Sequence, residues 1–177
     1  MVPLPKPSVD TGAGLERIAA VLQGVANNFH SDVFTPIIEE VEKVVGIKYE
    51  PGFALGRQPT PSGPRAIDPA SFRVIADHAR AVAFLLADGV FPSNDGRGYV
   101  LRRILRRAVR HAYRLGTRDL VTPRMVEATI AVMGEAYPDL VKHRDLVLGI
   151  VGREEERFLR TLQRGVDLLD DVLTEGD

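Results

Sequence analysis

The chain has 177 residues, of which 45% are hydrophobic, so it can bury a substantial core. It contains no cysteine, which excludes disulfides and thiolate metal sites, and its four histidines are too scattered for a ligand signature, so we predict no metal site. No run reaches the ~18 apolar residues that a membrane-spanning helix needs, and we expect a cytoplasmic protein without a membrane partner.

The N-terminal part predicts a strand, a glycine turn and two helices. A short extended segment ends near Val9, and the turn over 10–14 leads into a helix over 15–22 with apolar residues at helical spacing. A second helix should begin near Asp32, a good N-cap, and end at Gly46. Residues 51–69 hold five prolines and three glycines, a composition typical of a linker.

The C-terminal part predicts a set of helices. The segment 71–87 is apolar almost all round, so it should form a buried central helix. A loop rich in turn residues then leads to an arginine-rich helix that ends at Gly116. Thr122 should cap a helix that runs to about Ala136, and a long last helix should extend from about Asp139 to Leu173.

The arginine-rich helix is the most distinctive feature of the sequence. Eight arginines and no acid lie between Arg97 and Arg118, whereas the other 155 residues carry 15 basic and 24 acidic side chains, a balance of −9. A patch of one sign on an acidic body attracts a polyanion, and the planar fork of arginine suits phosphate, so we expect a nucleic-acid partner. The alternative is a solvated face, or salt bridges to the acidic helices further along the chain.

A helical wheel divides this stretch into two halves. One half is apolar and should be buried: Val100, Leu101, Ile104, Leu105, Ala108, Val109, Ala112 and Leu115. The opposite half is basic: Arg102, Arg103, Arg106, Arg107, Arg110 and Arg114.

Two loops could take part in binding. The loop over 92–98 precedes the arginine-rich helix, and the Asn94 side-chain oxygen could accept a hydrogen bond from a guanine amine in an RNA minor groove. Equally, Asn94 could only shape its own turn. The glycine turn at Gly12 and Gly14 opens a helix and could bind a phosphate or adenylate, or be a plain turn.

Two long stretches then resemble a known family. LPKPSVDTGAGLERIAAVLQ, residues 4–23, resembles the third signature motif of class II aminoacyl-tRNA synthetases in its alanyl form. FRVIADHARAVAFLLADGVFPSNDGRGYVLRRILRRAVRH, residues 72–111, is similar to the tRNA-recognition region that follows it, and REEERFLRTLQRG, residues 153–165, agrees with that family too.

The resemblance implies a mainly α fold, in which a helical tRNA-recognition domain follows a short strand-turn-helix remnant of a class II α+β catalytic domain. Residues 1–50 would be the C-terminal edge of the catalytic domain, 51–69 a Pro/Gly-rich linker, and 70–177 the helical tRNA-recognition domain.

It also implies the activity of alanyl-tRNA synthetases, the ligases that activate alanine with ATP and Mg²⁺ and transfer it to tRNA(Ala). In this family the aspartate matching Asp10 binds the ammonium of alanine. The glycines matching Gly12 and Gly14 line the adenylate. The arginine matching Arg17 braces the ATP phosphates.

The tRNA contacts follow from the same resemblance. The family identifies its tRNA by a G:U pair in the acceptor stem, and Asn94 would read the guanine amine that this pair leaves free. Further arginines would bind the RNA backbone: Arg97, Arg102, Arg103, Arg106, Arg107 and Arg110. We expect no DNA partner.

The family's other parts are expected outside this chain: the first two motifs, the editing domain with its zinc, and the C-terminal domain. The chain alone should therefore be inactive and bind no cofactor, and its own task would be to dock the acceptor stem. Two alternatives remain: a free-standing helical RNA-binding module without catalysis, and a helical scaffold that binds an acidic protein.

Overall fold

The computed structural model describes residues 12–50 and 68–174, and every regular element in these ranges is a helix. In chain order they are α1 (Leu15–Leu22), the 3₁₀ helix η1 (Asn28–His30), α2 (Thr35–Val45), α3 (Ala70–Ala87), α4 (Gly96–Arg114), α5 (Thr122–Met133), α6 (Pro138–Lys142) and α7 (Arg144–Thr174). The prediction of a mainly α protein is confirmed, and the strand predicted to end near Val9 lies outside the described residues.

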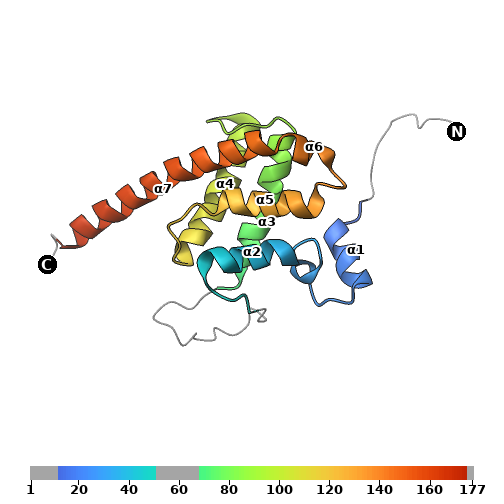
Figure 1. Cartoon of the computed structure of the whole chain (residues 1–177). Helices are drawn as coiled ribbons and strands as arrows, with labels where there is room; N and C mark the ends of the chain where they lie inside the picture. Colours follow the sequence, from blue (N-terminus) through green and yellow to red (C-terminus); the bar gives the residue numbers. More distant parts are fainter. Residues whose placement is uncertain (1–11, 51–67, 175–177) are drawn as a thin grey trace.

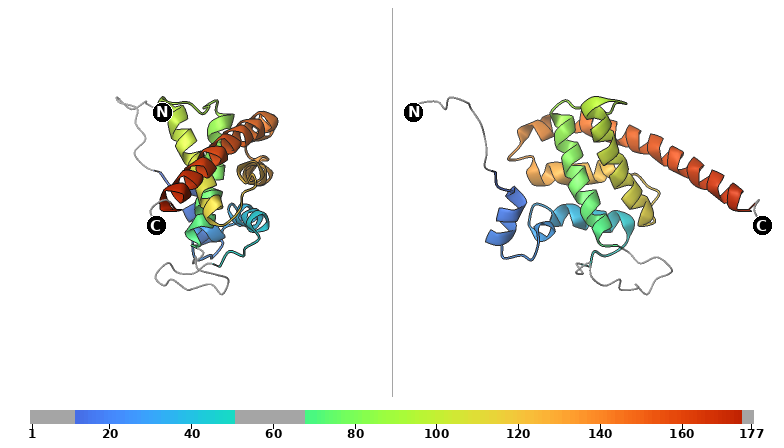
Figure 2. Two further views of the ribbon diagram at one scale, coloured as in Figure 1. Left: turned by 90° about the vertical axis from the view of Figure 1, so that its left-hand side faces the viewer. Right: turned by 180° about the vertical axis from the view of Figure 1, so that it is seen from behind.

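Helix α3 runs through the centre of the molecule, as its apolar composition predicted (Figures 1 and 2). Helices α2, α4 and α5 pack directly against it, and α6 and α7 also reach it. Its side chains at Phe72, Ile75 and Leu86 are almost fully buried. Because α3 contacts every one of these helices, it fixes the position of α4, the arginine-rich helix.

The core consists of two clusters along α3. One joins α2, the first half of α3 and α5, with Ile37 and Phe72 among its buried residues. The other joins the second half of α3 to α4, α5, α6 and α7, with Leu105 and Val147 among its buried residues. Helix α2 thus shares a core with α3 and α5. The division of the chain at the linker over 51–69 stays a prediction.

The start of α2 differs from the expectation. The predicted N-cap, Asp32, lies before the helix and exchanges two hydrogen bonds with the side chain of Gln23, at 2.7 and 3.0 Å. The helix begins only at Thr35, after the turn that follows η1. Its end is confirmed: Gly46 adopts the left-handed conformation with φ 69°, and its N–H donates to the carbonyl of Glu42.

The last predicted helix is two helices, so the prediction of one continuous element was wrong. Short α6 ends before His143, whose backbone leaves the helical conformation at φ −99° and ψ 10°. The bend lets Leu140 on one side and Val147 on the other enter the same core cluster. Helix α5 ends at Met133, three residues before the predicted end.

Helix α7 is the longest element, and its second half projects from the body of the molecule (Figure 1). The large apolar side chains there are exposed: Leu168, Leu169, Val172 and Leu173. In the part of the chain that the structure describes, no helix is both long and apolar enough to cross a membrane.

Candidate nucleic-acid interface

Helix α4 divides its arginines between two faces. Arg103, Arg107, Arg110 and Arg114 follow one another at spacings of four, three and four residues, which places them in one line along the helix. All four are exposed. At about 1.5 Å of rise per residue this line is ~16 Å long. We call these four residues the arginine stripe.

The stripe is a source of positive charge that ion pairs leave largely uncompensated. One carboxylate is near enough to respond to it: the pKa of Asp77 is lowered mainly by its hydrogen bond with His78 and, to a smaller degree, by the charges of Arg80 and Arg107. Within residues 12–50 and 68–174 none of its four guanidinium groups forms an ion pair, and Arg97, exposed in the first turn of α4, forms none either. Burial, together with the charges of Arg114 and Arg107, lowers the pKa of His111. The stripe therefore meets the electrostatic requirement for a phosphate backbone.

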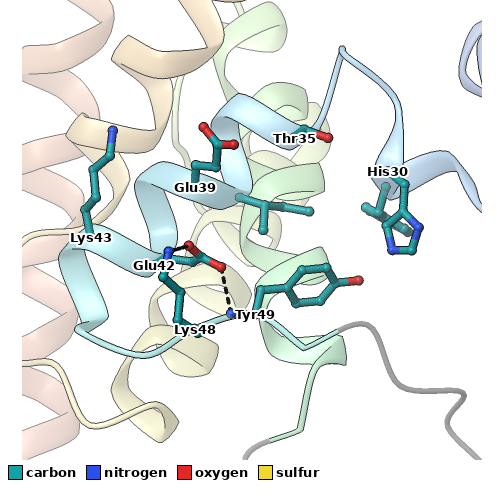
Figure 3. Close-up of a pocket in the computed structure, with 9 residues that line it drawn as sticks. His30, Thr35, Glu39, Glu42, Lys43, Lys48 and Tyr49 are labelled. Atoms are coloured by element: carbon teal, nitrogen blue, oxygen red, sulfur yellow. Dashed lines mark hydrogen bonds and ion pairs between the residues drawn. The ribbon is translucent and has the colours of Figure 1, made fainter. Parts of the chain in front are cut away.

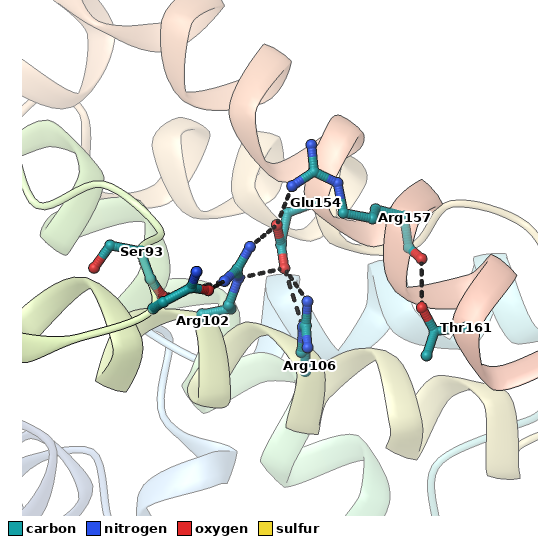
Figure 4. Close-up of polar contacts among 7 residues, drawn as sticks. Ser93, Arg102, Arg106, Glu154, Arg157 and Thr161 are labelled. Atoms are coloured by element: carbon teal, nitrogen blue, oxygen red, sulfur yellow. Dashed lines mark hydrogen bonds and ion pairs between the residues drawn. The ribbon is translucent and has the colours of Figure 1, made fainter. Parts of the chain in front are cut away.

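The remaining two arginines of the predicted basic half turn toward α7 (Figure 4). Arg102 donates from Nε to Glu154 Oε1 at 2.9 Å, and Arg106 donates to the same oxygen from Nε at 3.0 Å and from Nη2 at 2.8 Å. The Glu154 side chain is only 5% exposed, and Arg157 Nη1 lies 4.0 Å from its other oxygen. The alternative that the arginines form salt bridges to an acidic helix further along the chain is therefore correct for Arg102 and Arg106 in the free protein.

Asn94 is connected to this cluster. Arg102 Nη1 donates to the side-chain oxygen of Asn94 and to the carbonyl of Ser93, the latter at 3.2 Å. The loop itself lies close against α4: a Cβ on Gly98 would overlap the carbonyl oxygen of Phe91. Glycine is therefore required at position 98 for the loop that carries Asn94 to reach the helix.

The apolar half of the helical wheel is confirmed except at Val100, which is exposed, and at Ile104, which is only partly buried. Leu101, Leu105, Ala108, Val109 and Ala112 are buried. Val100, in contrast, is 54% exposed, so its predicted burial was wrong. It is the fifth residue of α4 and precedes Arg103 and Arg107 by three and seven residues, so it lies on the same side of the helix as the arginine stripe.

The residues predicted to bind alanine and ATP are only partly described. Asp10 lies outside the described residues. Gly12 and Gly14 precede α1, with Gly14 at its N-cap position, and Arg17 follows in the first turn; all three are exposed. An ion pair between Glu16 and Arg80 fastens α1 to α3. Their roles toward ATP stay predictions.

A hollow beside α2 was not predicted and contains none of the predicted site residues (Figure 3). Two of its charged groups pair with each other: Lys48 donates to Glu42 at 2.6 Å, and the N–H of Tyr49 donates to the same carboxylate at 2.8 Å. Burial raises the pKa of Glu42, but these two hydrogen bonds outweigh it and lower the pKa below its ordinary value. We assign no ligand to this hollow.

Two acidic residues with important contacts were missed at the sequence level. Glu154 binds Arg102 and Arg106 across 52 and 48 residues. Glu155, 1% exposed, accepts from the N–H of Val121 at 3.0 Å and from the N–H and hydroxyl of Thr122 at 2.8 and 2.6 Å. No local sequence signal marks either partner, because both contacts depend on how α7 crosses the other helices.

The chain is similar to known proteins along almost its whole length. Residues 1–176 match the family described as tRNA synthetases class II (A). The chain is similar to the alanine–tRNA ligases of Halorhodospira halophila and Nitrosomonas europaea, with 49% identity to each over 175 residues, which is 99% of this chain. It spans 18% of the length of each of these curated relatives. The chain therefore belongs to the class II tRNA synthetase family.

Proposed function

We propose that this chain is part of an alanine–tRNA ligase, in which it docks the acceptor stem of tRNA(Ala). The observation that carries the proposal is the arginine stripe: four exposed, unpaired guanidinium groups in one line on α4, with Asn94 in the loop just before that helix. The similarity to alanine–tRNA ligases over 99% of the chain supports the identity of the RNA.

In this proposal the two kinds of contact have separate tasks. The stripe and Arg97 bind backbone phosphates, which gives affinity without sequence preference. Asn94 accepts a hydrogen bond from the guanine amine of the G:U pair, which gives a preference of about 1–3 kcal/mol. Arg102 and Arg106, already bound to Glu154, contribute to the shape of the site rather than to phosphate binding.

The parent enzyme would supply the chemistry. Class II synthetases use ATP and Mg²⁺, and we infer that Asp10, Gly12, Gly14 and Arg17 belong to the site for alanine and ATP. There Arg17 would bind phosphate, and the exposed N-terminal amides of α1 would favour an anion. Alone, the chain is not expected to activate alanine. ATP–pyrophosphate exchange with the purified chain, dependent on alanine, would contradict this.

The test is binding to two RNA hairpins that copy the acceptor stem, one with G:U and one with G:C, over a series of salt concentrations. Each phosphate contact contributes a slope of roughly −0.7 to −0.9 in log K against log salt. The double variant Arg107→Gln with Arg110→Gln should reduce the slope by about 1.4–1.8. The matched control, Arg124→Gln with Arg144→Gln, removes the same charge from α5 and α7 and should leave the slope nearly unchanged.

The outcomes separate the alternatives. Equal binding to both hairpins would leave an RNA-binding module without base recognition. An absence of RNA binding would favour the scaffold for an acidic protein partner. Equal slope changes in the two double variants would show that the stripe is not the binding surface.

A further inference from the structure

We propose that Glu154 is a positioning residue for base recognition: through Arg102, it holds the side-chain amide of Asn94 in the orientation that reads the acceptor stem. The inference rests on the proposed function above. It assigns a task to a buried carboxylate on α7, a helix that provides none of the predicted RNA contacts.

The first step concerns Asn94 itself. Its side chain is exposed, and an asparagine amide can turn over and exchange its oxygen for its NH₂ group, which would replace an acceptor with a donor. Arginine has only donors, so Arg102 can hold the amide in just one of these two orientations, with the oxygen toward the guanidinium. An amide oxygen has two lone pairs, and one stays available for a guanine amine.

The second step concerns Arg102. Its guanidinium is planar and rigid, so its orientation is set when one edge is bound. The Nε edge lies against Glu154, with Nε 2.9 Å from Oε1 and Nη2 3.5 Å from Oε2. The opposite nitrogen, Nη1, is thereby aimed at Asn94 and at the Ser93 carbonyl. Glu154 thus fixes the direction of the bond that fixes the amide.

The third step concerns Glu154, which is held more firmly than a surface carboxylate. It is 5% exposed, and Arg106 donates to Oε1, the same oxygen that accepts from Arg102 Nε (Figure 4). Two guanidinium groups compensate its charge, and their geometry leaves it little freedom to rotate. A carboxylate held in this way can fix the orientation of the Arg102 guanidinium. In an exposed ion pair, water would replace the carboxylate as hydrogen-bond partner and the orientation would be lost.

For Glu154→Gln the inference predicts that affinity for RNA is kept or increased while the preference for G:U over G:C decreases. Loss of the carboxylate charge leaves Arg102 and Arg106 without their counter-charge, so affinity for both hairpins should stay equal or rise, with a steeper salt slope. The preference for G:U over G:C, about fivefold or more in the unaltered chain, should meanwhile decrease by roughly twofold or more. A residue needed only for folding would lose affinity for both hairpins together.

The experiment measures binding of the 177-residue chain and its variants to the G:U and G:C hairpins, with thermal unfolding of each variant as a check on folding. Glu156→Gln is the matched control, because Glu156 is the exposed neighbour two positions along α7. Arg102→Lys provides a second route: it keeps the positive charge but cannot hold Glu154 and Asn94 at once. It should lower the preference without steepening the slope.

A variant that combines Glu154→Gln with Asn94→Ala completes the test. If Glu154 acts through Asn94, Glu154→Gln should change the G:U preference no further once Asn94 is absent. An unchanged preference in both Glu154→Gln and Arg102→Lys would overturn the inference while the proposed function stands. If the unaltered chain binds both hairpins equally, base recognition by Asn94 fails, and the inference fails with it.

Discussion

Replacement of Glu155 by alanine should destabilise the protein strongly. Glu155 is 1% exposed and accepts three hydrogen bonds, two from the backbone N–H groups of Val121 and Thr122 and one from the Thr122 hydroxyl. The N–H groups are at the start of α5, where no residue within the helix can accept from them. Alanine would leave all three donors buried without a partner.

The magnitude follows from these contacts. Hydrogen bonds to a charged group contribute about 1.5–3 kcal/mol each, and desolvation of the carboxylate offsets part of that sum. We expect the free energy of unfolding to fall by about 3–5 kcal/mol, because each buried donor that loses its acceptor costs about 1–3 kcal/mol and removal of the buried carboxylate offsets part of the total. For a chain of this length the melting temperature should fall by roughly 10 °C. Thr122→Val, which removes only the hydroxyl, should cost about 1–2 kcal/mol.

The assay is unfolding in urea, monitored by circular dichroism. Glu156→Ala, on the exposed side of α7, is the control. The control should change the free energy of unfolding by less than about 0.5 kcal/mol. If Glu155→Ala costs no more than this control, the carboxylate does not cap α5, and the reasoning is refuted.

The same residue should give the protein a pH dependence. Burial raises the pKa of Glu155 above its ordinary 4.5, although the Thr122 and Val121 hydrogen bonds oppose that rise. The folded state therefore keeps this proton to a higher pH than the unfolded chain. The contribution of Glu155 to stability should fall as the pH rises from 4.5 through the raised pKa, and Glu155→Ala should remove this slope.

Three further predictions concern single positions. Gly98→Ala should cost roughly 2 kcal/mol or more in thermal unfolding, because the new Cβ overlaps the Phe91 carbonyl, and an unchanged melting temperature would contradict the close approach. Gly165→Ala, in α7 with open space around it, should stabilise the protein by ~1 kcal/mol, and destabilisation would mean that this helix is not regular there. Burial lowers the pKa of His111, so an NMR titration should place it below 6.5, and stability should fall as the pH drops below 6.5; a midpoint at or above 6.5 would contradict this.

The sequence predicted those parts of the fold that depend on local pattern. Apolar spacing located α3 and the buried side of α4, and Gly46 marked the end of α2. Each signal arises within one or two turns of helix, where periodicity and glycine conformation act directly. The start of α2 failed because Asp32 binds the Gln23 side chain, a contact across nine residues that competes with capping.

The candidate site was predictable only in part for the same reason. A helical wheel separates basic from apolar residues, but it cannot tell which basic residues meet another helix. Arg102 and Arg103 are neighbours in sequence, yet only Arg102 faces Glu154, because adjacent helical residues point about 100° apart. That distinction required the position of α7, which depends on packing in the second core cluster.

The adjacent carboxylates of α7 also determine how that helix is turned about its own axis. Glu154 is bound by α4 and Glu155 by the start of α5, in directions about 100° apart. Rotation of α7 in either sense would break at least one of these contacts. The projecting half of α7 therefore has a fixed rotation about the helix axis. The side that carries the exposed residues Leu169 and Leu173 faces one constant direction relative to the arginine stripe.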